Sequence, residues 1–195
     1  TTEFLWQEGH TAHATHEEAV DFAKRAHDWY RKVFEDLFAI PVMLGTKSST
    51  EKFAGAQTTY TIEALMPDGK ALQSATSHDL GQNFSKVFDI KYQNQKGQEE
   101  YVWQTSWGLS TRSLGGLFLA HGDDSGLRLP PNVAPTQVVI VPIVKTDSDA
   151  SAILSYTEDL YSKLQDAGIR TKIDSRTTVS PGRKFNDWEV KGVPV

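Results

Sequence analysis

Three stretches of the chain combine large aromatic rings, titratable side chains and glycines without the spacing of an amphipathic helix. They are residues 3–10 (EFLWQEGH), 76–84 (TSHDLGQNF) and 105–112 (TSWGLSTR). Taken singly, such a residue is more often part of a core or of a solvated surface. Their combination in three places favours a binding or catalytic role, and these stretches are the candidate functional site.

Most familiar catalytic signatures are absent. The sequence has no G-x-x-x-x-G-K-[ST] phosphate loop, no G-x-G-x-x-G, no G-x-S-x-G and no H-E-x-x-H. His10, His13 and His16 recur at every third residue, but they straddle the predicted start of a helix, which disfavours a metal site. The chain has no cysteine, which excludes a disulfide scaffold, a thiol nucleophile and a cysteine-based zinc site.

The charge is unevenly distributed along the 195 residues. The net charge is −5, so no general electrostatic attraction to nucleic acid is expected. From Leu129 onward, acidic and basic residues are equal in number, so the negative excess lies in residues 1–128. A local basic excess between Arg170 and Lys191 fits a polyanionic partner, and a solvated surface explains it equally well. No run of 18 apolar residues exists, and we expect no membrane span.

The first part of the chain is predicted to be rich in antiparallel strands. Thr15 and Glu18 form a capping box before a helix whose apolar residues recur at helical spacing up to Leu37. Residues 57–77 read as a hairpin that turns at Pro67-Asp68-Gly69. Residues 87–92 and 101–106 are predicted to form a second hairpin, and residues 114–120 a short apolar helix.

The pattern changes at Leu129-Pro130-Pro131. Residues 137–144 are a continuous apolar run, as in a strand buried on both faces. A helix closed by Gly168 follows, and then a strand over 170–174. This β-α-β unit predicts a three-layer α/β domain with a parallel strand pair, over residues 129–195. The chain as a whole is therefore α/β (α+β), with a first domain over residues 1–128.

Long blocks of the sequence resemble the prolyl-tRNA synthetases of the archaeal/eukaryotic type. They are EFLWQEGHTAHAT, EKFAGA, TSHDLGQNFSKVF, TSWGLSTRSLGGLFLAHGDDSGLRLPPNVAPTQVVIVPI and PGRKF-x-x-WEVKGVP, in this order. The resemblance covers nearly the whole chain. It implies a class II synthetase domain, an antiparallel sheet with flanking helices, followed by an anticodon-binding domain. Activation of L-proline with ATP and its transfer to tRNA(Pro) are the implied reactions.

The resemblance also implies site residues. For ATP they are Thr1, Phe4, Gln73, Thr76, Ser110 and Arg112, with Phe4 stacking on adenine, Arg112 holding phosphates and Gln73 near the Mg2+ that ATP carries. For proline they are Trp6, Glu8, His10, Phe53, His78 and Trp107. Such a set suits a compact apolar ring with a secondary ammonium, which needs aromatic walls and a carboxylate partner. Many family members carry threonine at Ser110, and the hydroxyl is kept.

Further expectations concern partners. The basic residues predicted to contact tRNA are Arg170, Lys172, Arg176, Arg183 and Lys184. A homodimer and a cytoplasmic location are implied, with no membrane partner. Motif 1 and the first half of motif 2 would precede Thr1, so the segment alone is expected to be inactive. The alternative is a non-catalytic, synthetase-like binding or regulatory protein, because a fold does not fix a function.

Overall fold

The computed structural model describes residues 2–144 and 147–195. The chain divides into two compact units, Thr1–Ala120 and His121–Val195. In the first unit the elements are β1 (Trp6–His13), α1 (His16–Lys32), the π-helical turn η1 (Val33–Leu37), β2 (Met43–Thr46), β3 (Thr58–Leu65), β4 (Ala71–Gly81), α2 (Asn83–Val87), β5 (Lys91–Gln93), β6 (Glu99–Tyr101), β7 (Trp103–Ser110) and α3 (Arg112–His121).

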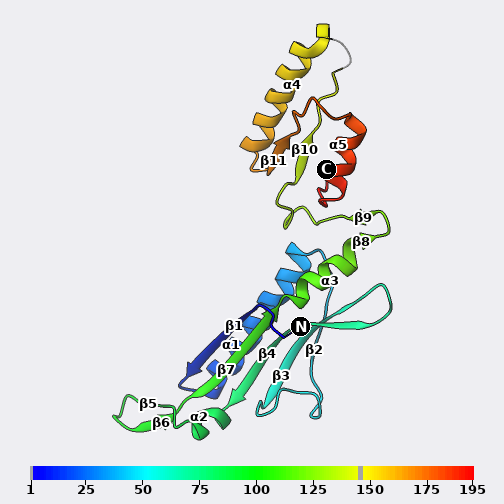
Figure 1. The fold of residues 1–195 in the computed structure, drawn as a ribbon. Coiled ribbons are helices and arrows are strands. Elements are labelled where there is room, and N and C mark those ends of the chain that lie inside the picture. Colours follow the sequence, from blue (N-terminus) through cyan, green and yellow to red (C-terminus); the bar gives the residue numbers. More distant parts are fainter. Residues whose placement is uncertain (1, 145–146) are drawn as a thin grey trace. The chain divides into compact units, whose positions relative to one another are not determined.

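A five-stranded sheet forms the first unit, in the order β1-β7-β4-β3-β2, and α1 lies along one of its faces (Figure 1). All its neighbouring strands are antiparallel. The predicted hairpin at residues 57–77 is confirmed as β3 and β4. The core lies between the sheet and the helical elements α1 and η1, where Tyr30, Phe34 and Ile62 are buried. The predicted antiparallel sheet with flanking helices is confirmed.

Helix α1 begins where the sequence predicts. Thr15 is the N-cap residue, and its side-chain oxygen accepts a hydrogen bond from the backbone N–H of Glu18. This bond satisfies one of the backbone donors that the first helical turn leaves without a partner. The buried face of α1 consists largely of small residues, Ala19, Ala23 and Ala26, so the helix approaches the sheet closely.

The predicted second hairpin over residues 87–92 and 101–106 is wrong in its extent. Val87 ends helix α2, and Asp89 has a φ of 55°, which interrupts the extended backbone. Only the short strands β5 and β6 pair with each other. Strand β7 instead crosses into the main sheet between β1 and β4. Pairing with strands far away in sequence is decided by the tertiary fold, which a local pattern does not contain.

In the second unit the elements are β8 (Gly122–Asp123), β9 (Gly126–Leu127), β10 (Val138–Ile140), α4 (Asp147–Asp166), β11 (Thr171–Ile173) and α5 (Pro181–Glu189). The predicted parallel pair is confirmed, since β10 and β11 are parallel. Gly168, with a φ of +76°, provides the left-handed residue that follows α4. Helix α5 is capped by Ser180, whose side chain accepts from the backbone N–H of Arg183.

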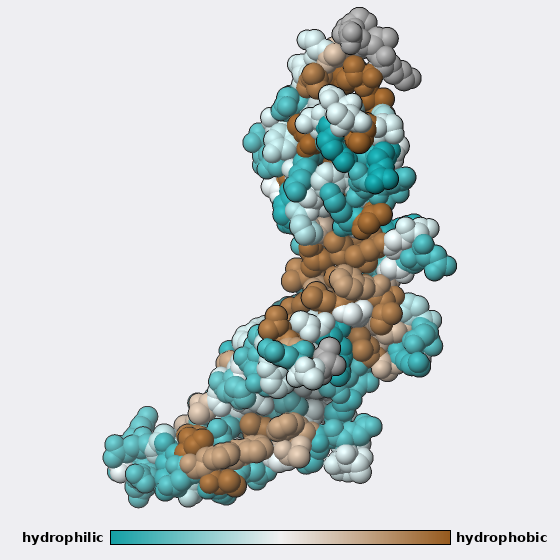
Figure 2. All heavy atoms as spheres, in the orientation of Figure 1, coloured by the Kyte–Doolittle hydropathy of each residue, from teal (hydrophilic) through white to brown (hydrophobic). Residues whose placement is uncertain are grey.

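Apolar side chains also reach the surface (Figure 2). On α3, Leu114, Phe118 and Leu119 are exposed. Among the described residues, no helix is both long and apolar enough to cross a bilayer.

Candidate active site

The three stretches singled out in the sequence lie on three neighbouring strands, β1, β7 and β4. The register aligns them: Glu8 lies opposite Gly108, and His10 lies opposite Ser106, which in turn lies opposite His78. Because side chains alternate along a strand, paired residues share one face of the sheet. Alternate residues of all three strands therefore meet on the face that α1 does not cover.

A cavity of about 620 Å³ opens over this face. This volume is typical of a site for a small organic ligand. Of the twelve residues predicted to contact ATP or proline, all but Thr1 line it, namely Phe4, Trp6, Glu8, His10, Phe53, Gln73, Thr76, His78, Trp107, Ser110 and Arg112. Thr1 lies outside the described residues.

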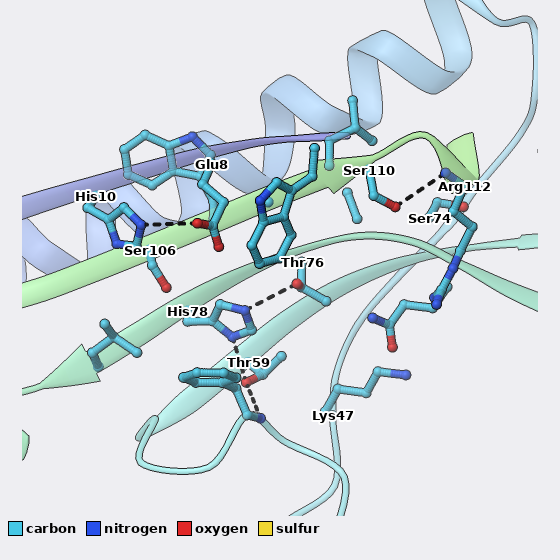
Figure 3. Close-up of a pocket in the computed structure, with 18 of the residues that line it drawn as sticks. Glu8, His10, Lys47, Thr59, Ser74, Thr76, His78, Ser106, Ser110 and Arg112 are labelled. Carbon is cyan, nitrogen blue, oxygen red and sulfur yellow. Dashed lines mark hydrogen bonds and ion pairs between the residues drawn. The ribbon is translucent and has the colours of Figure 1, made fainter. Parts of the chain in front are cut away.

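The cavity has chemically distinct sides (Figure 3). Glu8 and His10, from β1, lie close together, with 3.6 Å between a carboxylate oxygen of Glu8 and His10 Nε2. Gly108 faces Glu8 across the strand pair, and a Cβ added there would lie 3.9 Å from Cγ of Glu8. Ser110 and Arg112 lie on another side of the cavity, at the junction of β7 and α3.

His78 lies in the floor of the cavity, and both of its ring nitrogens are hydrogen-bonded. Nδ1 lies 2.9 Å from the hydroxyl of Thr59, and Nε2 lies 3.1 Å from the hydroxyl of Thr76 (Figure 3). Burial lowers the pKa of His78 to about 4 from its ordinary 6.5, because the charged form loses hydration. His78 is therefore neutral at pH 7. Its ring also packs against Phe53, with the ring centres 4.9 Å apart.

Arg112 is the first residue of α3, and its side chain remains available. Its backbone N–H donates to the hydroxyl of Ser110 at 3.3 Å. Within residues 2–144 and 147–195, no carboxylate lies at ion-pair distance from its guanidinium. A cation at the start of a helix adds to the partial positive charge of the exposed backbone N–H groups there, so this end of the cavity suits an anion.

Trp107 departs from the predicted arrangement. It borders the cavity, but its ring packs on the α1 side of the sheet, 5.2 Å from the ring of Phe22 and 6.5 Å from that of Trp29. Gly9 is opposite, and a side chain there would collide with the indole. Strand alternation is the reason: Ser106 and Gly108 face the cavity, so the residue between them faces the helix. Trp107 supports the floor from behind, and Trp6 is the indole on the cavity side.

Comparison with known proteins shows the family to which the chain belongs. Residues 1–121 match the tRNA synthetase class II core domain (G, H, P, S and T), and residues 137–195 match the anticodon binding domain. The chain belongs to the class II tRNA synthetases. The predicted resemblance to prolyl-tRNA synthetases is also confirmed, because the relatives described next carry that name, while the archaeal/eukaryotic type stays a prediction.

A proline–tRNA ligase of Flavobacterium psychrophilum is 56% identical over all 195 residues, which are 40% of its length. A chloroplastic/mitochondrial proline–tRNA ligase of Arabidopsis thaliana is 54% identical over the whole chain, which is 36% of its length. The crystal structure of the Cryptosporidium parvum prolyl-tRNA synthetase with L-proline and AMP has a TM-score of 0.89 and 49% identity, over 99% of this chain and 42% of that one. The chain thus spans about 40% of the length of the curated relatives it matches.

In the anticodon-binding unit of this synthetase chain, three of the five basic residues predicted to contact tRNA have internal partners. Arg170 donates to the backbone oxygens of Pro131, Asn132 and Ala134. Lys184 is 5% exposed and donates to the backbone oxygen of Asp174. These bonds hold a loop and α5 in place.

The third internally bonded residue is Arg176, whose guanidinium bridges the carboxylates of Asp174 and Asp187. Its hydrogen bonds hold the pKa of Asp174 far below the ordinary value of 3.8, and Trp188 adds another by donating its indole N–H to the same carboxylate. Arg183 and Lys172 are less constrained. Arg183 makes one exposed ion pair with Asp187, and the Lys172 amine lies 5.9 Å from the Trp188 ring centre.

Sequence reasoning missed several residues of the candidate site. Lys47, Glu51, Thr59, Ser74 and Ser106 line the cavity as well. Ser106 and Thr59 each lie opposite His78, a predicted residue, on a neighbouring strand. The strand register would have identified both residues, but the sequence does not contain it. Among the described residues, no group of three histidine or acidic side chains is placed to hold a metal ion. His16 instead pairs with Asp79, on the α1 side of the sheet.

Proposed function

We propose that the protein is a proline–tRNA ligase, which activates L-proline with ATP and transfers the prolyl group to tRNA. The observation that carries this proposal is the meeting of eleven predicted substrate residues in one cavity. The C. parvum relative, solved with L-proline and AMP, supports the same pair of ligands.

The amino acid end of the site is proposed to be the side that carries Glu8 and His10. Phe53, Trp6 and the ring of His78 provide flat apolar surfaces that suit the pyrrolidine ring. Glu8 accepts a charge-assisted hydrogen bond from the secondary ammonium. His78 is neutral, since burial lowers its pKa to about 4, and it therefore does not repel this cation.

The nucleotide end is proposed to be the side that carries Ser110 and Arg112. Phe4 is 58% exposed, precedes β1 and packs edge-on with the ring of Trp6, and its proposed role is to stack on the adenine. Arg112 binds phosphate oxygens, Thr76 and Ser110 offer hydroxyls to ATP, and Thr1 completes the set. Mg2+ that arrives with ATP commonly keeps its phosphate and water ligands and takes few from the protein, which fits the amide oxygen of Gln73. Bound there, the ion would neutralise phosphate charge.

The chemistry needs no covalent enzyme intermediate. A carboxylate oxygen of proline attacks the α-phosphorus of ATP, the bond to the bridging oxygen breaks, and pyrophosphate leaves. A ribose hydroxyl of the tRNA terminus then attacks the prolyl carbonyl, the bond from that carbonyl carbon to the phosphate oxygen breaks, and AMP departs as the hydroxyl loses its proton. In this reaction the protein aligns the carboxylate with the phosphorus and neutralises the charge on the leaving group, which is the role proposed for Arg112.

We further propose that residues 1–128 belong to the catalytic domain and residues 129–195 to the domain that binds the anticodon. The match of residues 137–195 to the anticodon binding domain supports this division. A homodimer is proposed from the family resemblance. The cytoplasm is the proposed location, and the name of the Arabidopsis relative indicates that members also serve organelles.

The direct test is pyrophosphate exchange into ATP by the full-length protein, with each of several amino acids in turn. Exchange that depends on L-proline, and that exceeds the rate with alanine, is the expected result. A full-length protein that binds tRNA but shows no amino-acid-dependent exchange would instead be the non-catalytic relative.

A further inference from the structure

Thr59 lines the cavity and contacts two parts of the candidate proline site at once. Its hydroxyl oxygen accepts a hydrogen bond from the backbone N–H of Phe53 at 3.0 Å. The same oxygen lies 2.9 Å from Nδ1 of His78. The residue is only 2% exposed, so water does not compete for these bonds. Thr59 therefore connects the loop that carries Phe53 to the histidine in the floor.

The position of each hydrogen follows from counting donors and acceptors. A neutral imidazole has one N–H and one bare nitrogen, and a hydroxyl has one hydrogen to donate. Suppose that Nδ1 carried the hydrogen. Thr59 would then accept from both Phe53 and His78, and its own hydrogen would be buried without an acceptor among the described residues. A buried donor without a partner is costly. The opposite tautomer satisfies the buried groups: Thr59 donates to Nδ1, and Nε2–H donates to Thr76, whose own hydroxyl hydrogen is left on the side of the cavity.

The consequence reaches the cavity through Thr76. Its hydroxyl oxygen, 3.1 Å from Nε2, accepts the hydrogen of His78. The hydroxyl hydrogen of Thr76 is then free to point elsewhere, and Thr76 lines the cavity. Because the hydroxyl oxygen of Thr76 accepts from His78, its hydrogen points away from His78 and is available to a ligand in the cavity.

We propose that Thr59 is a positioning residue: it holds His78 in the Nε2–H tautomer, so that Thr76 donates its hydroxyl hydrogen to an anionic oxygen of the bound substrate. The inference rests on the proposed function for the identity of that oxygen, which is a carboxylate oxygen of proline or a phosphate oxygen of ATP. The tautomer itself rests only on the geometry.

The first experiment measures the tautomer in the full-length protein. Histidine labelled with 15N in the ring distinguishes a protonated from a bare ring nitrogen by NMR, and His78→Asn assigns the signal. Wild-type protein is expected to show Nε2 protonated and Nδ1 bare at pH 7. Wild-type protein with Nδ1 protonated would overturn the proposal, without any variant and without reference to activity.

The second experiment removes the hydroxyl. Thr59→Val keeps the shape of the side chain, whereas Thr59→Ser keeps the hydroxyl. In Thr59→Val, the KM of one substrate in proline-dependent pyrophosphate exchange is expected to rise about fivefold to tenfold, the scale of one directed hydrogen bond. Thr59→Ser should restore it. A selective rise for proline identifies the carboxylate as the acceptor, and a selective rise for ATP identifies the phosphate.

The matched control is Thr61→Val. Thr61 lies two residues further along β3, is also buried, with 5% exposure, and directs its hydroxyl toward Glu63 rather than toward a histidine. It should change neither KM. Equal rises for both substrates in Thr59→Val, no rise in either, or no rescue by serine would each overturn the proposal. Wild-type protein without proline-dependent exchange would overturn the proposed function instead, and the measured tautomer would still stand.

Discussion

Replacement of Glu8 by glutamine tests the proposed contact with the proline ammonium. The change keeps the shape of the side chain and removes its charge. A hydrogen bond to a charged group contributes roughly 1.5–3 kcal/mol. The Glu8 side chain is 38% exposed, and solvent screening places it in the lower half of that range, about 1.5–2 kcal/mol. Since every 1.4 kcal/mol is about a factor of ten, the KM for proline should rise about tenfold to thirtyfold.

The assay is pyrophosphate exchange in the full-length protein, with proline and ATP varied separately. The KM for ATP should stay within about twofold, because the proposed nucleotide residues lie on another side of the cavity. Glu17→Gln provides the control, since Glu17 is an exposed carboxylate in the first turn of α1. If both KM values rise together, or if the control behaves like Glu8→Gln, then Glu8 acts on the fold and not on proline.

Four further variants test other residues of the protein. Arg112→Ala should lower the exchange rate at least about a hundredfold, the scale of losing one preorganised charged donor. The melting temperature should not change, because Arg112 is exposed and has no carboxylate partner in the part of the chain that the structure describes. Near-normal exchange would refute its role. Charge reversal of Lys172 and Arg183 together should weaken tRNA charging but not exchange, whereas Arg176→Ala should lower the melting temperature of the second unit; normal charging by the double variant would move the tRNA contacts elsewhere. His78 has a pKa of about 4 when folded and 6.5 ordinarily, so the unfolded chain binds the proton first. Stability against urea should therefore fall as the pH is lowered from about 6.5 to about 4, and His78→Asn should flatten this dependence.

Local physics in the sequence predicts the elements that depend on neighbours along the chain. The cap at Thr15 and the turn at Pro67-Asp68-Gly69 are both found, because each is decided by bonds and backbone angles within a few residues. The parallel pair of β10 and β11 is also found, since a strand–helix–strand sequence permits few other arrangements. Elements whose partners lie far away in the sequence are harder to predict. Strand β7 is an example, because its sequence resembles half of a local hairpin, while its partners in the sheet are β1 and β4.

The lack of information on strand pairing also limits the prediction of the site. The resemblance identifies residue types for the cavity, but only the register of β1, β7 and β4 decides which face each residue occupies, and this register turns the ring of Trp107 toward α1.

The basic residues of the second unit show what a count of charges along the sequence leaves out. Net charge along a sequence counts Arg176 and Lys184 as cations available to a polyanion. In the fold, Arg176 bridges two carboxylates and Lys184 is buried against a backbone oxygen. A charge that already has a buried partner would lose that bond on turning to a phosphate, so it contributes little to affinity. The predicted contact with tRNA therefore depends on the cations that the fold leaves to solvent, above all Lys172 and the partly paired Arg183.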